Sequence, residues 1–564
     1  MQHHVFTIAK VCQQFGAEHA VICPGSRSAP LVYAFTRNPN MKCYSAVDER
    51  SAAFMALGMA QQLQKPVVLI STSGTACLNF FPAIAEAYYQ HIPLLILTAD
   101  RPPELLNQQD GQMIMQKGVF GKHVIGSHEL LCFEEDKVDY KLTERIVYNA
   151  LEETMSENGF GPVHINVPLR EPLYNELEHV DVPKITYAKQ VKLLSGVTLL
   201  PQLDNLLHAW KISKKKMVLV GQMAPSSILS NILNYFVNQD DVLVLSDIVS
   251  NQHECSNAPL FDGILQFLPE EELTGLEPDL ILSFGGPFVS KSLKTWLKKQ
   301  KPEHHFRIQK SEQLIDTYQN VTHHIQADLL PYLEAFQSLK IFNHPSQKPY
   351  SAEWRRLNKM VAEKLRVFHA QEIWCEPTAF KKVLNHLGEN SSLQLGNSSS
   401  VRWASWNGLP LKALHSFCNR GTSGIDGTIS TAIGSAKIMA HKTVTLICGD
   451  LSLFYDQNGF WQNNLPSNLK IIILNNGQGN IFNWIDGPSK HPVELPYFTT
   501  PNNLSIKRLA EQYGLKYYQC NTHHSIEHML NKTFEKHDVP VILELHFEEA
   551  INLEAIKKFR QLTN

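Results

Sequence analysis

Residues 443–485, TVTLICGDLSLFYDQNGFWQNNLPSNLKIIILNNGQGNIFNWI, form the most informative stretch of the chain. Two continuous apolar runs, 444–448 and 470–474, are separated by a helical interval, and each run ends in a polar turn. Uninterrupted apolar runs joined through a helix are typical of parallel strands with both faces covered. The stretch therefore predicts two neighbouring buried strands of an α/β sheet.

Polar residues follow both strands: Gly449-Asp450, a predicted turn, comes after the first, and Asn475-Asn476 after the second. Ligands of such sheets bind beyond the carboxyl ends of the strands, so we expect these residues to lie close together. A carboxylate, an amide oxygen and turn carbonyls suit Mg²⁺, which adds phosphate oxygens and water. Taken alone, each turn is better explained as a helix cap or a simple chain reversal. The pair at this spacing favours a metal–phosphate site.

Length and composition limit the class of protein. A chain of 564 residues with 43% hydrophobic content predicts two to four domains, and a net charge of −3 provides no basic field for nucleic acid. The ten cysteines form no CxxC motif, and some, such as Cys23 and Cys448, lie in apolar runs, which indicates reduced thiols in a cytoplasmic protein. We find no signal-peptide pattern and no apolar run long enough to span a membrane, so we expect no membrane insertion.

Three successive strand–helix alternations predict three tandem α/β domains with mostly parallel sheets, covering residues 1–175, 200–340 and 351–564. The middle domain lacks a full GxGxxG motif, so we interpret it as a scaffold. We predict a linker at residues 343–350. A less ordered, mixed-charge stretch is expected between the first domain and about residue 200. The predicted helices include 50–64 and 82–89. The predicted strands are 20–23, 67–71, 94–98, 163–167, 217–220, 242–245, 280–284, 306–309, 392–395, 415–417, 444–448, 471–474 and 541–545.

Several arginines follow predicted strand ends. A single arginine is most often a surface or ion-pairing residue, but its rigid fork binds carboxylates through two hydrogen bonds. Several such residues at the opening of one binding site therefore predict a substrate with more than one carboxylate. The candidates are Ser26 and Arg27 in CPGSRSAPL, Arg101 in TADRP, Gln112 in DGQM, Asn397, Ser398 and Arg402 in GNSSSVR, and Arg420 in CNRGTSGIDG.

The order GD, helical interval, NN resembles the diphosphate-binding signature of thiamine-diphosphate enzymes, and three α/β domains match their Pyr–middle–PP layout. This resemblance implies that Gly449 and Asp450 bind the cofactor, and that Asp450, Asn476 and the Gln478 carbonyl hold Mg²⁺ or Mn²⁺. Glu49, in SAVDERSAAFMALGMAQ, would otherwise be an ordinary carboxylate at a helix start. The resemblance makes it the catalytic acid against N1′ of the thiamine diphosphate aminopyrimidine.

PGSRSAPL, DERSAAF, TADRPPE, NSSSVR and NRGTSGIDG together resemble one family of these enzymes, the 2-succinyl-5-enolpyruvyl-6-hydroxy-3-cyclohexene-1-carboxylate synthases of menaquinone biosynthesis. The resemblance implies decarboxylation of 2-oxoglutarate and 1,4-addition of the resulting carbanion to isochorismate. It places Ile425 beneath the cofactor and makes Arg402 and Ser398 the candidates for 2-oxoglutarate. Arg27, Arg101, Gln112 and Arg420 could bind either substrate. It also implies a homodimer with sites between subunits, or a homotetramer.

The sequence departs from this family at two positions. Gln478 occupies a usual glycine position, which is tolerable if its φ is not positive. Relatives have adjacent Lys-Arg where this chain has Lys291-Ser292, so Lys291 is a weaker substrate-binding candidate. Two alternatives stay open: another thiamine-diphosphate decarboxylase or acetolactate-synthase-like carboligase, and a non-catalytic relative. The arginines argue against the first, and intact Glu49, Asp450 and Asn476 argue against the second.

Overall fold

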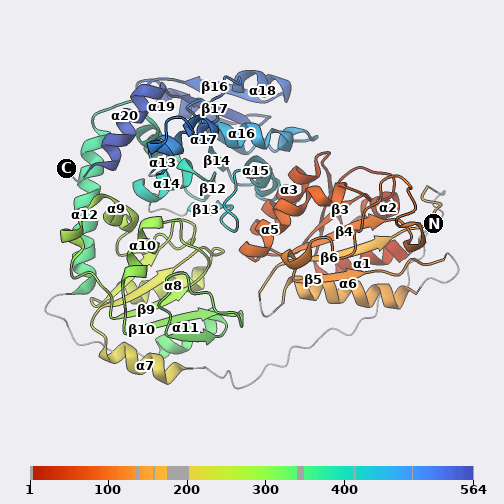
Figure 1. Ribbon diagram of the computed structural model, residues 1–564, viewed down its shortest axis with the longest axis horizontal. Coiled ribbons are helices and arrows are strands. Elements are labelled where there is room, and N and C mark those ends of the chain that lie inside the picture. The colour runs from red at the N-terminus through yellow and green to blue at the C-terminus, as the bar shows by residue number, and fades with distance from the viewer. Residues whose placement is uncertain are drawn as a thin grey trace. The chain divides into compact units, whose positions relative to one another are not determined.

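The structure is a computed structural model that describes residues 4–134, 139–156, 159–174, 202–339, 349–410, 414–485 and 487–562 (Figure 1). It contains sheets of six, five and six strands. The described residues fold into two compact units. The first is formed from Met1–Leu194, Asn419–Val444 and Ser452–Leu469, and the second from Ser195–Cys418, Thr445–Leu451 and Lys470–Asn564. Each unit is treated separately below.

The first unit contains a six-stranded parallel sheet in the order β2-β1-β3-β4-β6-β5. Three of its interior strands, β3, β4 and β6, are buried along their whole length, as their mainly apolar sequences predict. The strands are β1 (His19–Ile22), β2 (Lys42–Ser45), β3 (Val67–Ser71), β4 (Leu94–Asp100), β5 (Gly126–Glu129) and β6 (Pro162–Pro168). The helices are α1 (His4–Phe15), α2 (Ala29–Thr36), α3 (Glu49–Leu63), α4 (Ala76–Asn79), α5 (Phe81–Gln90), α6 (Tyr140–Thr154) and α15 (Thr428–Ile438).

Helix α15 packs along α3, although the two are far apart in the sequence. Glycines allow this approach at two points. A Cβ on Gly58 would lie 2.1 Å from the carbonyl oxygen of Thr431, and one on Gly434 would lie 2.1 Å from that of Met55. Any side chain at either position would force the helices apart, so the small residues of both helices are needed for this contact.

The second unit contains a five-stranded sheet in the order β11-β10-β9-β7-β8, in which all pairings are parallel. Its strands are β7 (Lys216–Val220), β8 (Val242–Ser246), β9 (Leu280–Phe284), β10 (His304–Gln309) and β11 (His323–Gln326). The accompanying helices are α7 (Leu203–Ile212), α8 (Ser227–Val237), α9 (Phe261–Phe267), α10 (Lys291–Lys299) and α11 (Leu329–Ser338).

A further six-stranded sheet has the order β13-β12-β14-β15-β17-β16 and supplies the strand ends that carry Asp450 and Asn476. Its strands are β12 (Ser391–Leu395), β13 (Leu414–Cys418), β14 (Val444–Gly449), β15 (Leu469–Asn475), β16 (Lys516–Cys520) and β17 (Val541–His546). The remaining helices are α12 (Tyr350–His369), α13 (Glu376–His386), α14 (Ser399–Asn407), α16 (Asp450–Tyr455), α17 (Leu495–Thr499), α18 (Ile506–Gln512), α19 (Ile526–Phe534) and α20 (Glu549–Arg560).

The predicted fold class, tandem α/β domains with mostly parallel sheets, is confirmed, and every predicted strand is present with its ends shifted by at most two residues. Strands β2, β5, β11 and β16 were not predicted. The linker prediction is wrong at Tyr350, which opens α12, is buried, and donates its hydroxyl to the Leu276 carbonyl at 2.8 Å. Residues 343–348 and most of the mixed-charge stretch lie outside the described residues. The three domain boundaries stay a prediction.

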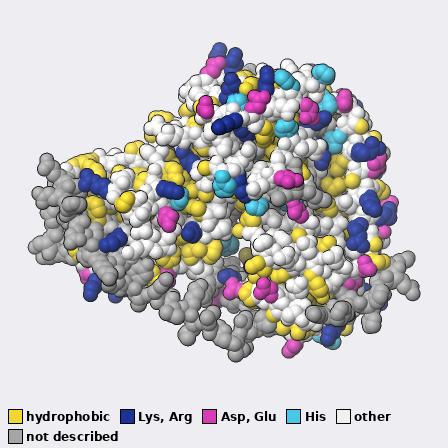
Figure 2. All heavy atoms as spheres, turned by 180° about the vertical axis from the view of Figure 1, so that it is seen from behind, with side chains coloured by type: hydrophobic (Ala, Val, Ile, Leu, Met, Phe, Trp, Pro, Cys, Tyr) yellow, Lys and Arg dark blue, Asp and Glu magenta, His cyan; other side chains and the backbone are white. Residues whose placement is uncertain are grey.

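Two surface features complete the description. On the face shown in Figure 2, the described Lys and Arg side chains are interspersed with Asp and Glu. None of the described helices combines the length and the apolar character that crossing a membrane requires.

Candidate active site

Asp450 is a buried carboxylate at the point where β14 ends and α16 begins. It is the first residue of the helix, so the predicted turn at Gly449-Asp450 is wrong: the strand passes directly into the helix. Only 1% of Asp450 is exposed, and this burial raises its pKa to about 7, although hydrogen bonds from Asn502 and the backbone oppose the shift. A buried acid whose charged form is disfavoured gains most from a nearby cation.

The turn after β15 lies beside Asp450, and Asn502 joins the two. The Nδ2 of Asn502 lies 3.2 Å from Oδ2 of Asp450 and 3.3 Å from the carbonyl oxygen of Gly477. The backbone N–H of Asn502 also donates to that carbonyl, at 2.8 Å. The structure therefore brings together the start of α16 and the turn after β15, which lie far apart in the sequence.

Glu376, the first residue of α13, orients the side chain of Asn476. Its Oε1 accepts hydrogen bonds from Nδ2 of Asn476 at 2.9 Å and Nδ2 of Asn552 at 2.8 Å, and its Oε2 accepts one from Trp403 at 2.8 Å. Because a carboxylate can only accept, the nitrogen of the Asn476 amide must face Glu376. The Asn476 oxygen on the other side of the amide accepts from the Gln478 N–H at 3.1 Å and keeps a second lone pair.

The backbone of Gln478 tolerates a side chain, because its φ is not positive. The positive φ of this turn, 72°, belongs to Gly477, and Gln478 is not among the residues with positive φ. The Gln478 side chain donates to Oε1 of Glu549 at 2.7 Å. Its carbonyl accepts one hydrogen bond, from Asn480 N–H at 2.9 Å, which leaves a second lone pair.

This donor set fits a small divalent ion that is bound together with a phosphate group. Asp450, Asn476 Oδ1 and the Gln478 carbonyl are hard oxygen ligands. A Cβ on Gly449 would meet no atom within 4 Å, so the space at the end of β14 is open. Within the described residues, no three His, Cys, Asp or Glu side chains form a metal-binding group. An ion here would therefore need further oxygens from water and phosphate.

A cavity of about 420 Å³ in the second unit brings together several cations. Lys291 and Arg402 line it, as does Arg560 from α20. Arg402 donates Nη1 to the Ser398 carbonyl at 2.7 Å. Asp262 is the buried acid of this cavity; burial raises its pKa, and it accepts hydrogen bonds from Ser290 and Ser405. The cavity thus offers cations to an anionic ligand.

Two other candidates of the second unit lie just before α14. Asn397 is 4% exposed, and its Oδ1 accepts a hydrogen bond from the Cys418 thiol at 3.4 Å. Ser398 has a φ of 72°, which is unfavourable for a non-glycine residue. Strained residues of this kind concentrate at functional sites.

Ser292, next to Lys291, donates to Gln266 at 3.0 Å and lines the cavity of about 420 Å³.

In the first unit, Glu49 is the first residue of α3. The preceding residue, Asp48, caps the helix by accepting from the Ser51 N–H at 3.0 Å. Nδ2 of Asn79 lies 3.4 Å from Oε2 of Glu49, and burial raises the pKa of Glu49. A half-buried carboxylate with a raised pKa is suited to sharing a proton.

Arg27 and Arg101 both belong to the first unit, and burial, together with the charge of Arg101, lowers the pKa of Arg27. Arg27 donates to the Leu169 carbonyl at 3.0 Å and pairs with Glu171 at 3.0 Å. Arg101 donates to the carbonyl of Gly111 at 2.9 Å, next to the exposed Gln112, which has a φ of 55°. Ser26 is exposed beside Arg27.

The predicted site residues divide between the two units. Those of the first unit are Glu49, Ser26, Arg27, Arg101, Gln112, Arg420 and Ile425, and those of the second are Gly449, Asp450, Asn476, Gln478, Lys291, Asn397, Ser398 and Arg402. Sequence reasoning missed Asn502, Glu376 and Arg560. None lies in a recognisable motif; the only signal was Glu376-Pro377, which is typical of an ordinary helix start.

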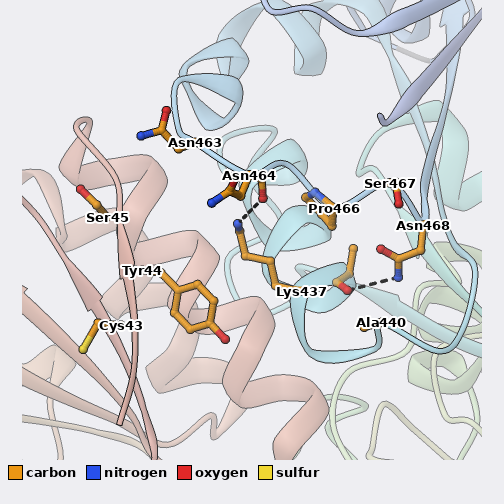
Figure 3. A pocket seen from close by; sticks show the side chains of 11 residues that line it. Cys43, Tyr44, Ser45, Lys437, Ala440, Asn463, Asn464, Pro466, Ser467 and Asn468 are labelled. Atoms are coloured by element: carbon orange, nitrogen blue, oxygen red, sulfur yellow. Dashed lines mark hydrogen bonds between the residues drawn. The ribbon is translucent and has the colours of Figure 1, made fainter. Parts of the chain in front are cut away.

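A larger cavity of about 610 Å³ contains none of the predicted residues. It lies in the first unit, between β2, the end of α15 and residues 463–468, which precede β15 (Figure 3). Its polar side chains serve the fold: Lys437 donates to the Asn464 carbonyl at 2.9 Å, and Asn468 donates to three carbonyls at the end of α15. We therefore do not assign this cavity to the candidate active site.

Comparison with known families gives matches to three parts of the chain. Residues 4–119 match the model "Thiamine pyrophosphate enzyme, N-terminal TPP binding domain". Residues 197–395 match "Middle domain of thiamine pyrophosphate", and residues 397–545 match "Thiamine pyrophosphate enzyme, C-terminal TPP binding domain". These matches identify a thiamine-pyrophosphate-binding enzyme.

Individual relatives are similar over their full length. The chain is 36% identical over 569 residues to a protein of Flavobacterium psychrophilum, covering 99% of this chain and 98% of the relative. It is 37% identical over 562 residues to one of Cytophaga hutchinsonii, with 99% and 98% covered. It is 32% identical over 567 residues to one of Bacteroides thetaiotaomicron, with the same shares covered. All three are named 2-succinyl-5-enolpyruvyl-6-hydroxy-3-cyclohexene-1-carboxylate synthase. The chain belongs to this family of thiamine pyrophosphate enzymes.

Proposed function

We propose that the chain converts 2-oxoglutarate and isochorismate into 2-succinyl-5-enolpyruvyl-6-hydroxy-3-cyclohexene-1-carboxylate, with release of CO₂, in menaquinone biosynthesis. The observation that carries the proposal is the junction of the Asp450 helix start and the Asn476 turn through Asn502, in a chain that matches this synthase family from end to end. The cationic cavity of Lys291, Arg402 and Arg560 supports substrates with several carboxylates.

The cofactor is thiamine diphosphate, and we propose Mg²⁺, or Mn²⁺, as its metal. Asp450, Asn476 Oδ1 and the Gln478 carbonyl would hold the ion, and Gly449 would leave room for the diphosphate. When bound, thiamine diphosphate supplies the nucleophilic carbon and accepts the electron pair released with CO₂. The protein residues bind, orient and exchange protons around it.

Glu49 would hold a proton at N1′ of the aminopyrimidine. Its raised pKa, caused by burial, favours the shared proton that this role requires. Asn79 donates to the same carboxylate and restricts its orientation. Ile425, which is half-buried, would support the cofactor from below.

The basic residues would bind the substrate carboxylates. We assign Arg402 and Ser398 to 2-oxoglutarate, because Arg402 lines the cationic cavity and donates to the Ser398 carbonyl. Fixed cations of this kind need no reorganisation during the reaction. The residues that would bind either substrate are Ser26, Arg27, Arg101, Gln112, Lys291, Asn397 and Arg420.

We also propose the assembly and location of the enzyme. The working unit would be a homodimer with active sites between subunits, or a homotetramer made of two such dimers. The domains would be residues 1–175 (pyrimidine-binding), 200–340 (middle) and 351–564 (diphosphate-binding). All ten cysteines are free thiols, which supports a location in the reducing cytoplasm.

An assay that omits one component at a time tests the proposal. Purified protein with thiamine diphosphate, Mg²⁺, 2-oxoglutarate and isochorismate should release one CO₂ for each isochorismate consumed, and omission of any component should abolish the product. In a parallel reaction, pyruvate replaces both substrates. Product from pyruvate alone would favour an acetolactate-synthase-like carboligase and contradict our substrate assignment.

A further inference from the structure

Glu86 of α5 is a buried carboxylate whose hydrogen-bond partners are all neutral. It is 1% exposed. Its Oε1 accepts from the Gly421 N–H at 2.7 Å, and its Oε2 accepts from the N–H and the hydroxyl of Thr422 at 2.6 and 2.5 Å. Gln90 also donates to Oε1, at 2.5 Å. No ion pair of Glu86 is found within the described residues, so these neutral donors must offset the cost of burying its carboxylate.

These contacts fasten one particular loop. Gly421 and Thr422 follow Arg420 directly, and all three belong to the first unit together with α5. The approach is close: a Cβ on Gly421 would lie 2.7 Å from the carbonyl oxygen of Glu86 and 3.1 Å from its Oε1. Through these two consecutive N–H groups and the hydroxyl, Glu86 holds the backbone that directly follows Arg420.

From these contacts we infer that Glu86 is a positioning residue, which fixes the backbone of the 420–422 loop so that the Arg420 guanidinium is aimed at a carboxylate of one substrate. The inference rests on the proposed function. Neither the motif of the loop nor the match to the family assigns a role to Glu86. Hydrogen bonds from two successive N–H groups to a charged carboxylate are stronger than those to a neutral acceptor. They therefore resist small displacements of the loop.

Glu86→Gln tests this inference because it changes little in volume. An amide has one acceptor oxygen, and its NH₂ group would oppose one of the loop N–H donors. We expect the KM of one substrate to rise about tenfold or more, since hydrogen bonds to a charged group are lost, while kcat changes by less than about threefold. The affected substrate should be the one whose KM rises in Arg420→Gln.

A double-mutant cycle separates positioning from general damage. If Glu86 acts through Arg420, adding Glu86→Gln to Arg420→Gln should change the KM by less than about twofold. Equal factors in both backgrounds would overturn the inference, as would an unchanged KM in Glu86→Gln or in Arg420→Gln. Thr422→Val, which removes one donor and leaves the carboxylate, should raise the same KM by a smaller factor. If Glu86→Gln does not fold, Thr422→Val replaces it in the cycle with Arg420→Gln. An unchanged KM in Thr422→Val would then overturn the inference.

Asp241→Asn provides the matched control. Asp241 is another buried acid, paired with Lys216 in the five-stranded sheet region, and its loss should leave both KM values within about twofold. The wild-type protein must first form product from 2-oxoglutarate and isochorismate. Failure at that step refutes the proposed function, whereas product formation with an unchanged KM in Glu86→Gln refutes only the role of Glu86.

Discussion

Asn502 and Asp450 share a hydrogen bond of 3.2 Å, and the same Asn502 nitrogen lies 3.3 Å from the Gly477 carbonyl. One side chain thus fixes the spacing between the start of α16 and the turn after β15. Asp450 lies at the first of these places, and Asn476 and Gln478 lie at the second. The spacing of the metal ligands that we propose depends on Asn502, which is itself no ligand.

Asn502→Leu should therefore weaken cofactor binding that depends on the metal. Loss of a hydrogen bond to a charged group leads us to expect an affinity for thiamine diphosphate in Mg²⁺ about ten- to a hundredfold lower, measured by calorimetry. Excess chelator should release the cofactor from the wild-type protein and the variant alike. Asn463→Ala, a change to an exposed asparagine, is the control and should bind normally. Wild-type affinity in Asn502→Leu would contradict this role.

Arg560 should contribute to substrate binding. Its guanidinium lies 5.3 Å from the centre of the Trp484 ring and donates to the Trp484 carbonyl, and its Nε is buried without a partner within the described residues. Arg560→Gln should raise the KM of one substrate about tenfold with little change in kcat. Lys299 lines the same cavity but is exposed and paired with Glu270, so Lys299→Gln should change KM by less than about twofold. Equal effects of the two variants would count against a specific role for Arg560.

Asp456 should make the stability of the protein without cofactor depend on pH. Its carboxylate accepts from the N–H and the hydroxyl of Ser430 at 2.7 and 2.9 Å, and burial raises its pKa to about 7 from an ordinary 3.8. A raised pKa in an acid means that the folded state holds the proton more tightly than the unfolded state. This contribution is complete below about pH 4 and is lost as the pH rises through about 7.

Thermal unfolding of Asp456→Asn tests the direction of this effect. The variant cannot ionise at this position. The melting temperature of the variant minus that of the wild-type protein should therefore increase as the pH rises from 5 to 8. The measurement uses protein without cofactor, so that binding does not add its own pH dependence. A difference that stays constant over this range would show that Asp456 does not titrate there.

The sequence predicted the centre of each sheet better than its edges. Strands such as β3 and β15 are continuous apolar runs, because neighbouring strands and helices cover them on all sides. The missed strands β2, β5, β11 and β16 each lie at the edge of a sheet. Lys42 and Ser45 of β2 are exposed, so this strand needs no apolar run and gives no periodic signal.

The site follows the same division between local and long-range information. Glu49, Asp450 and Asn476 lie in short motifs whose neighbours in the sequence are also their neighbours in space. Glu376 and Asn502 act across the fold on residues far away in the chain. Their roles depend on burial and orientation, which a single sequence does not contain.

Turnover by Glu49→Gln is the most direct test of the proposal that Glu49 carries out the proton chemistry of the bound thiamine diphosphate. The change removes the acid but leaves the oxygen ligands at Asp450 and Asn476 intact. Calorimetry should find thiamine diphosphate and Mg²⁺ still bound, while turnover of 2-oxoglutarate and isochorismate falls by about 10²–10⁴-fold, the range for loss of a general acid or base. Near-normal turnover at full cofactor occupancy would contradict the role of Glu49 and the mechanism built on it.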